Sequence, residues 1–583
     1  MTRRPRASFR GRRFSSRRNT ISIACIALWF VAVLLASAVG RVDVAAQEPP
    51  TSIVVTSTAD DEDATSQDNA CVAESGGCTL RAAIQEANRQ PGPNTIAFNI
   101  PGDGPHTIAL TTTLPWLSDA TGPTLIDGYS QPGAIPNSDP ANSIAKIMVQ
   151  IVGPRTIDDR RSIDGLVVAS AGNEIRGLAF TRLKRSIWMR GSEARGTIIT
   201  GTFVGIGADG QPWYDDIDAV EHRGGDPGAF GIWLSGGASD NRIGGTTPSE
   251  RNVISGNAND GIGMRGAATS GNVIIGNIIG LSPDGSRRVR NWGDGIDLNY
   301  GTQNTRIGGT EPGERNVISG NHGEGIEISH GTMTIRNVVV GNVIGTGTDG
   351  RVADSRDFRN SGFGVSLEGD VRDNTVGPGN LIANNDKGGI EIYGQNNLGN
   401  QVFGNVIGLD ADGAPLPNRG PGVRIRYHAA SVTVGPDNRI AHNEGPGILI
   451  IDGDVRLTTI TRKEIYANAG SGIVVNEEPI ASTSDSRTTS RALDTRPGPP
   501  SIATASRTSV GGTTCPGCTV EVFLADAGAE QPGQGKAFVG AGVASSSGTF
   551  LVAIDRAPIG SHVTATTTSP VGATSIFATT VAV

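Results

Sequence analysis

The chain has 583 residues, of which 82 are glycine and only 4% are aromatic, and its formal net charge is -8 at pH 7. A charge this mild, with no basic stripe, excludes nucleic acid as an expected partner. The shortage of aromatic residues favours a narrow core of Ile and Val, and the length allows more than one domain.

Residues 1–46 are predicted to be a signal peptide. A basic segment, Arg3 to Arg18, precedes an apolar run, Ile21–Leu35, and a small-residue cleavage site at Ala36–Ala38; Ala45–Ala46 is an alternative site. An uncleaved signal anchor is the other interpretation. We expect a secreted protein or one on a bacterial cell surface, with membrane contact only through this segment.

The cysteines outside this segment form two close pairs, Cys71 with Cys78 and Cys515 with Cys518. Local disulfides are expected in an oxidising compartment. A zinc site built from all four thiols is the alternative, and a redox Cys-x-x-Cys at Cys515 is disfavoured because no helix pattern follows it.

Residues 47–120 are predicted to form an N-terminal cap. A strand near Ile53–Thr56 is followed by a helical pattern in which Leu80, Ala83, Ile84 and Ala87 share one face. A short amphipathic helix at this place would cover the open end of a solenoid.

A tandem array occupies residues 121–480. The phrase Gly-hydrophobic-x-hydrophobic returns every 25 to 39 residues, starting at Gly231, Gly261, Gly295, Gly325, Gly364, Gly389, Gly422, Gly447 and Gly472. Each interval holds three short β-branched runs bounded by Gly, Asn, Asp or Ser, and none holds a helical window. This pattern predicts an all-β, right-handed parallel β-helix of about eleven or twelve coils.

Asparagine recurs at a fixed offset from this phrase and introduces the third run of each coil. Equivalent residues one coil apart could bond through their amides, so we predict a structural Asn ladder. Its members are Asn252, Asn277, Asn316, Asn342, Asn380, Asn405 and Asn438. Asp-Gly pairs at Asp209, Asp284, Asp349 and Asp412 predict stacked corner loops on alternate coils.

The segment Cys78–Ala83 resembles the CSLREA motif of exported bacterial proteins, departing from it at Thr79 and Ala82. The Asn-Val-Ile-Ser-Gly-Asn phrases at Asn252 and Asn316 are similar to β-helix repeats of proteins that carry this motif. The resemblance covers roughly residues 51–480. It implies a pectate-lyase-like solenoid and export, but no particular activity.

Residues 481–500 predict a Pro-rich linker, and residues 501–583 predict a small β-sandwich. Short alternating strands such as Thr519–Leu524 and His562–Thr566 resemble immunoglobulin-like modules of bacterial surface proteins.

The x position of the repeat should point outward and align from coil to coil. It places Trp188 beside Trp233, a predicted platform for sugar rings, unless the long loop between them folds over both. It also places Asp297 beside Glu327, a predicted Ca²⁺ pair, with Glu391 and Arg424 further along. These four charged residues are also the catalytic candidates if the protein is an enzyme.

We expect a monomer that binds a polysaccharide or cell-surface glycan without catalysis, because no diagnostic catalytic motif is found. No cofactor is expected to be required, and Ca²⁺ is the one ion that the acidic pair suggests. The alternatives are a polysaccharide lyase or glycoside hydrolase using the acidic column, and a structural envelope spacer.

Overall fold

The computed structural model describes residues 51–65, 68–154, 162–213, 229–352, 358–451, 457–476, 496–528 and 533–583. The predicted signal peptide and most of the predicted linker lie outside these residues. No helix in the described part of the chain is both long and apolar enough to cross a bilayer.

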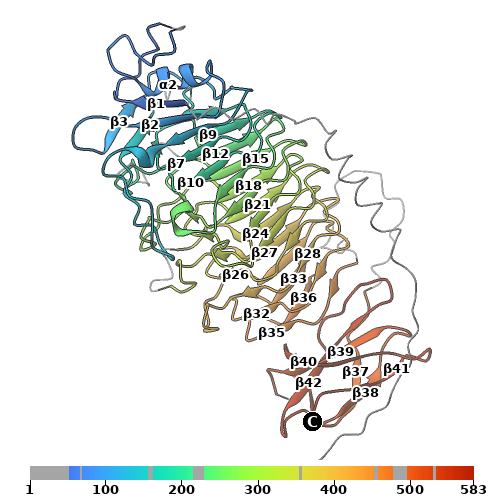
Figure 1. The fold of residues 1–583 in the computed structure, drawn as a ribbon. Coiled ribbons are helices and arrows are strands. Elements are labelled where there is room, and N and C mark those ends of the chain that lie inside the picture. The colour runs from blue at the N-terminus through green and yellow to red at the C-terminus, as the bar shows by residue number, and fades with distance from the viewer. Residues whose placement is uncertain are drawn as a thin grey trace, which may run out of the picture. The chain divides into compact units, whose positions relative to one another are not determined.

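Three long parallel sheets run through the solenoid (Figure 1), and from β4 onward each coil contributes one strand to each sheet. Sheet 1 contains β1 (Thr51–Val55), β2 (Asn94–Phe98), β4 (Thr124–Asp127), β7 (Glu174–Arg176), β10 (Ile198–Thr200), β13 (Arg242–Gly244), β16 (Val273–Ile275), β19 (Arg306–Gly308), β22 (Val338–Val340), β25 (Thr375–Val376), β28 (Gln401–Val402), β31 (Thr433–Val434) and β34 (Thr459–Ile460).

Sheet 2 contains β3 (His106–Ala109), β5 (Val149–Val152), β8 (Ala179–Thr181), β11 (Phe203–Val204), β14 (Val253–Ile254), β17 (Ile278–Ile279), β20 (Val317–Ile318), β23 (Val343–Ile344), β26 (Leu381–Ile382), β29 (Val406–Ile407), β32 (Arg439–Ala441) and β35 (Glu464–Tyr466). Sheet 3 contains β6 (Leu166–Val168), β9 (Arg185–Arg190), β12 (Phe230–Ser235), β15 (Ile262–Arg265), β18 (Ile296–Asn299), β21 (Ile326–Ser329), β24 (Phe363–Glu368), β27 (Gly388–Tyr393), β30 (Val423–Arg426), β33 (Ile448–Ile451) and β36 (Ile473–Asn476). The predicted fold class, a parallel β-helix, is therefore confirmed.

The Gly-hydrophobic-x-hydrophobic phrase forms the strands of sheet 3. Its two apolar positions, such as Ile232 and Leu234, are fully buried in one core that runs along the solenoid. Its glycine allows consecutive coils to approach closely, since a Cβ at Gly231 would come within 2.4 Å of the Gly261 carbonyl oxygen. Small residues at this corner and β-branched residues in the strands thus give every coil the same cross-section.

The predicted Asn column forms a continuous ladder at the entry to sheet 2. From Asn252 to Asn438, the Nδ2 of each residue donates to the Oδ1 of its equivalent one coil further on, at 2.9–3.2 Å. All seven side chains are buried. Identical amides satisfy one another at every step, so the polar column costs little in an apolar interior.

A second ladder follows sheet 2, and the sequence analysis missed it. It runs through Asn257, Asn291, Asn321, Asn360, Asn385, Asn418, Asn443 and Asn468 with bonds of 2.8–2.9 Å. The signal in the sequence was an asparagine four residues before each repeat glycine from Gly261 to Gly472. Two ladders therefore brace the two ends of each sheet 2 strand.

The Asp-Gly corners stack against one another on alternate coils. A Cβ at Gly210 would come within 2.9 Å of Pro283, and Arg351 pairs with Asp412 of the next such corner. A loop from the N-terminal part crosses these corners, where Thr348 donates to Asn142 at 2.9 Å. The expanded corners therefore form a row along one side of sheet 2.

Helix α2 (Leu80–Ala87) lies at the N-terminal end of the core, against β1 and β2. Thr79 caps it by accepting a hydrogen bond from the Ala82 amide, and Leu80 and Ile84 are fully buried in the solenoid core. The helix supplies apolar contacts that a preceding coil would otherwise provide.

The C-terminal residues form two antiparallel sheets around a small core of their own. One contains β37 (Ser501–Ala505), β38 (Ser509–Thr513) and β41 (Thr549–Ala553); the other contains β39 (Thr519–Ala525), β40 (Gly535–Val543), β42 (His562–Thr568) and β43 (Val581–Ala582). The immunoglobulin-like assignment and the domain boundaries stay predictions.

These C-terminal sheets contact the last coil, where both ladders end. Gln534 takes the place of a further asparagine: Asn468 donates to its Oε1 at 2.9 Å. Lys463 follows Asn438 in the first ladder, is fully buried, and lies 3.5 Å from the Glu521 carboxylate. Burial lowers the pKa of Lys463 to about 8. The expected picture of a module held only by a linker is therefore incomplete.

Candidate functional site

The outward x residues of sheet 3 align from coil to coil as predicted. Strand pairing places Trp188 opposite Trp233, Asp297 opposite Glu327, and Glu391 opposite Arg424. The whole column reads Val167, Trp188, Trp233, Gly263, Asp297, Glu327, Ser366, Glu391, Arg424, Leu449 and Val474.

The column is only partly exposed. Val167 and Ser366 are fully buried, Glu391 is 3% exposed and Asp297 is 8% exposed. Neighbouring long side chains contact part of the column, such as Arg185 over Trp188 and Arg426 on Glu391, and the sequence pattern of one coil does not specify these contacts. The acidic residues therefore have less water around them than their outward direction suggests.

A second acidic column lies beside the first, and the sequence analysis missed it. The residue immediately before the repeat glycine is Asp260, Asp294 and Glu324 on three successive coils. The Asp294 amide donates to Asp260 at 2.9 Å, and the Glu324 amide donates to Asp294 at 2.6 Å. The Asn-Asp-Gly, Gly-Asp-Gly and Gly-Glu-Gly triplets at these positions were the available signal.

Glycines make room for these carboxylates. A Cβ at Gly293 would come within 2.0 Å of an Asp260 oxygen, and a Cβ at Gly323 within 2.1 Å of an Asp294 oxygen. Each carboxylate thus lies over the bare backbone of the next coil. We call the group Asp260, Asp294, Asp297, Glu324 and Glu327 the acidic cluster.

Three members of the acidic cluster are placed to hold a metal ion. Asp294, Glu324 and Glu327 each offer a carboxylate oxygen, and these oxygens all lie within 4.8 Å of one another. The Oδ1 of the buried Asp297, one strand away from Glu327, has no hydrogen-bond partner among the described residues. An unpaired buried carboxylate oxygen on the strand next to Glu327 favours a cation as the missing partner.

The cluster strongly perturbs the ionisation of its members. Burial, with repulsion from Glu327, raises the pKa of Asp260 to about 7. Burial and the neighbouring carboxylates raise the pKa values of Asp294 and Asp297 well above the ordinary range. The same causes raise the pKa of Glu368, on the adjacent strand β24, to about 7. Without a cation, several of these groups therefore hold protons near neutral pH.

Basic residues lie around the cluster. Lys387 pairs with Glu324 at 3.2 Å. Further along sheet 3, Arg424 and Arg426 both donate to one oxygen of Glu391, at 2.8 and 2.7 Å. Glu391 is therefore engaged by two guanidinium groups and separate from the acidic cluster.

The two tryptophans are neighbours, but both are only partly exposed. Trp188 lies under the Arg185 guanidinium, 3.5 Å from its ring centre, and donates to the Ser235 hydroxyl at 2.9 Å. Trp233 packs on Phe230 and lies over Gly263, where a Cβ would come within 2.4 Å of its ring. Trp188 is thus occupied by the protein itself, while Trp233 forms one border of the outward face near the cluster.

The predicted cysteine pairs form disulfides in the structure, Cys71–Cys78 and Cys515–Cys518. Neither lies in the acidic cluster. With the described thiols paired in this way, the four-cysteine zinc site weighed from the sequence does not form.

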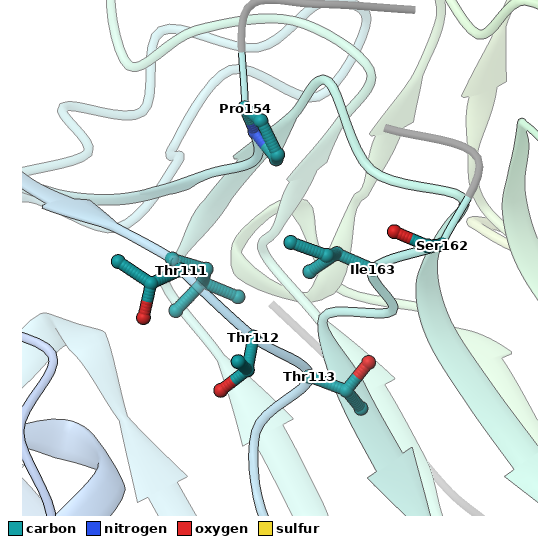
Figure 2. Close-up of a pocket in the computed structure, with 7 residues that line it drawn as sticks. Thr111, Thr112, Thr113, Pro154, Ser162 and Ile163 are labelled. Carbon is teal, nitrogen blue, oxygen red and sulfur yellow. The ribbon is translucent and has the colours of Figure 1, made fainter. Parts of the chain in front are cut away.

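A pocket of about 560 Å³ lies at the N-terminal end of the solenoid, away from the acidic cluster (Figure 2). Thr111, Thr112 and Thr113 line one side and Ile163 the other. The carbonyls of Thr112 and Thr113 accept hydrogen bonds from Arg81 at 2.9 Å, and the Thr113 hydroxyl accepts from the Asp164 amide at 3.0 Å. These polar groups already have protein partners, so the pocket does not show a site for chemistry.

The fold and the cluster define a parallel β-helix with an acidic site on one outward face. A family model described as periplasmic copper-binding protein (NosD) matches residues 279–469, which is less than half of the chain. That segment is similar to a periplasmic family. None of the curated proteins matches the sequence.

Several solved structures match parts of the chain at low identity. A variant of the periplasmic alginate epimerase AlgG matches with 11% identity and a TM-score of 0.28, over 67% of this chain and 66% of that one. The A-module of the mannuronan C-5 epimerase AlgE4 from Azotobacter vinelandii matches with 14% identity and a TM-score of 0.34, over 69% of this chain and 94% of that one. A capsular polysaccharide depolymerase, the tailspike protein gp49 of the Acinetobacter baumannii bacteriophage Fri1, matches with 8% identity and a TM-score of 0.24, over 82% and 73%.

The donor set of the acidic cluster does not fit copper. Protein copper sites use imidazole, thiolate or thioether ligands, whereas carboxylate oxygens suit Ca²⁺, Mg²⁺ or Mn²⁺. Asp294, Glu324 and Glu327 supply oxygen alone. The cluster therefore fits a hard divalent cation.

Proposed function

We propose that this protein is an exported, non-enzymatic β-helix protein that binds an acidic glycan through a divalent cation held by the acidic cluster. The basic and apolar N-terminal segment, the two disulfides and the partial similarity to a periplasmic family support export. Ca²⁺ is the ion we favour, because it accepts several carboxylate ligands in flexible geometry.

One observation carries this proposal: Asp294, Glu324 and Glu327 can place oxygens within 4.8 Å of one another, and the buried Asp297, paired with Glu327 across adjacent strands, has an Oδ1 without a described hydrogen-bond partner. Carboxylates that serve only as a solvated surface would be spread apart and exposed. Here they are gathered and partly buried, at a cost that a bound cation offsets. A cation with open coordination positions can also take the carboxylate of an acidic sugar.

The test is calcium titration of the full chain by calorimetry, followed by glycan-array binding in Ca²⁺ and in EDTA. We expect one Ca²⁺ per chain and glycan signals that disappear in EDTA. The double variant Glu324→Gln, Glu327→Gln should lose both, whereas Glu311→Gln, which changes an exposed glutamate elsewhere, should retain both. A wild-type chain that takes up no Ca²⁺, Mg²⁺ or Mn²⁺ would refute the proposal.

A second candidate is an enzyme that cleaves polysaccharide, either a lyase or a glycoside hydrolase. It is favoured by Asp260 and Glu368, because a carboxyl group with a pKa of about 7 can donate a proton near neutral pH. New reducing ends or unsaturated uronates from a polysaccharide panel, lost in Asp297→Ala and Glu327→Ala, would establish it. Absence of binding and cleavage alike would instead favour a structural spacer.

A further inference from the structure

A left-handed residue follows each of eight sheet 3 strands, at the point where the chain leaves the sheet. In five coils this residue is glycine, with φ between 70° and 125°: Gly191, Gly236, Gly266, Gly369 and Gly394. In three coils it is aromatic, with φ of 51°, 50° and 58°: Tyr300, His330 and Tyr427. Glycine adopts this conformation freely, whereas a bulky residue with a Cβ adopts it at a steric cost.

Burial of the three aromatic side chains does not offset the steric cost of their left-handed backbone, because all three are exposed. Tyr300 is 49% exposed and Tyr427 is 53% exposed, and His330 is also exposed. The core at this corner is already closed in the coils that carry glycine. A strained backbone that keeps a large exposed ring, where glycine would fit better, indicates a function for the ring.

Tyr300 and His330 lie on adjacent coils, and Tyr427 lies three coils beyond His330, after the two coils that carry Gly369 and Gly394. The Tyr300 and His330 rings stack with 5.3 Å between ring centres and 14° between planes. The Arg265 guanidinium lies 4.2 Å from the centre of the Tyr300 ring. Tyr427 lies 6.0 Å from Tyr393, whose ring is covered by Arg426 at 4.3 Å.

This row lies beside the acidic cluster. Asn299 immediately precedes Tyr300 and donates from Nδ2 to a carboxylate oxygen of Asp297. Ser329 pairs with Asn299 across the two strands and immediately precedes His330. Asp297 lies on β18, and Tyr300, three residues further on, immediately follows that strand. A ligand held by the cluster would therefore reach the Tyr300–His330 stack within the length of one short strand.

We propose that Tyr300, His330 and Tyr427 form an aromatic ridge whose exposed ring edges contact a glycan lying along the solenoid axis. The exposed edges of these rings suit sugars, because apolar ring carbons can contact the C–H side of a pyranose while the phenol or imidazole bonds a hydroxyl. The flanking guanidinium groups add donors for hydroxyl or carboxylate oxygens. This inference rests on the proposed glycan function and assigns the recognition of sugar rings to the ridge and that of acidic groups to the cation.

The test uses the full chain and three linear hexasaccharides: hexamers of galacturonic acid, of mannuronic acid and of β-1,4-linked glucose. The triple variant Tyr300→Gly, His330→Gly, Tyr427→Gly removes the rings and relieves the left-handed strain. We expect at least a tenfold loss of hexamer affinity, unchanged calcium titration and a melting temperature equal to or above that of the wild type. A merely structural role would instead lower the melting temperature. Met333→Ala, an exposed apolar residue of the same turn as His330, is the matched control and should bind normally.

The outcomes separate the ridge from the cation site. Hexamer binding by the triple variant at wild-type affinity would overturn the ridge and leave the cation-dependent function standing. Binding that is independent of Ca²⁺ but lost in the triple variant would support the ridge and overturn the cation bridge. A wild-type chain that binds none of the three hexamers would overturn the ridge, whatever its affinity for Ca²⁺.

Discussion

The two Asn ladders and the outward face of sheet 3 use the same coils in opposite ways. In the ladders one residue type repeats, and each amide bonds to the next. Along sheet 3 the residue changes from coil to coil, and Asp297 retains an oxygen without a described partner. Where one residue type repeats, identical polar groups can form hydrogen bonds with one another. Where the residue changes from coil to coil, a buried polar atom can be left without a hydrogen-bond partner in the protein. The ladders therefore contribute to stability, whereas sheet 3 carries the proposed binding site.

The largest effect is expected where the ladders end. Glu521→Ala would leave the fully buried Lys463 ammonium without its carboxylate partner. Breaking a buried ion pair by removing one partner costs about 3–5 kcal/mol. Chemical denaturation should show this loss in free energy of unfolding. A loss below about 1 kcal/mol would mean that the C-terminal sheets do not seal the last coil in solution.

Breaking a ladder at mid-length should cost somewhat less. Asn316→Ala removes the donor to Asn342 and to the Ile274 carbonyl, and removes the acceptor of Asn277. Buried polar groups left unpaired cost about 1–3 kcal/mol each, so we expect a destabilisation of about 2–4 kcal/mol by denaturation. Gln395→Ala, at an exposed polar position, should change stability by less than about 0.5 kcal/mol. Equal effects at the two positions would show that the ladder is not a stabilising unit.

The acidic cluster should make stability fall as pH rises. The folded chain holds a proton on Asp260 up to about pH 7, whereas the unfolded chain loses it near the ordinary Asp pKa of 3.8. The folded state therefore binds more protons than the unfolded state between these values, and its stability in EDTA should decrease by on the order of 2 kcal/mol from pH 5 to pH 7.5. Melting curves at both pH values measure it.

Calcium supplies the control for this pH effect. Excess Ca²⁺ should restore the stability lost at pH 7.5, because the cation replaces the protons among the carboxylates. Asp260→Asn should make the profile in EDTA less steep, while Asp294, Asp297 and Glu368 keep part of the pH dependence. A wild-type profile in EDTA that is already flat would mean that the carboxylates are not coupled as the structure places them.

The smallest effect is expected for the unpaired oxygen itself. Asp297→Asn keeps the shape of the side chain but removes a buried carboxylate, so the calcium-free protein should become more stable at pH 7.5 by about 1 kcal/mol. The same variant should gain less stability from Ca²⁺ than the wild type does. Denaturation in EDTA and in Ca²⁺ measures both changes, and destabilisation in EDTA would show that Asp297 has a structural partner.

Much of the fold could be predicted because each coil repeats a local pattern. The strands near Gly231 and the first ladder follow from spacing alone, and the register that brings Asp297 beside Glu327 follows from stacking the phrases. The second acidic column was also present in the sequence, as the residue before each repeat glycine, but its meaning depends on the turn geometry. The role of Arg185 over Trp188 could not be predicted, since rotamers of long side chains follow from packing between coils.

The sequence by itself determined the solenoid, its core-facing residues and the alignment of its outward column, because a hydrophobic pattern with this period can bury its apolar side chains only by coiling. Only the tertiary structure decided which of those outward residues are buried and which carboxylates lie close together. It also decided which residues cover the last coil. Burial and pKa depend on neighbours dozens of residues away in the chain, such as Asp260 for Asp294 and Glu521 for Lys463. No pattern within a single coil specifies those neighbours.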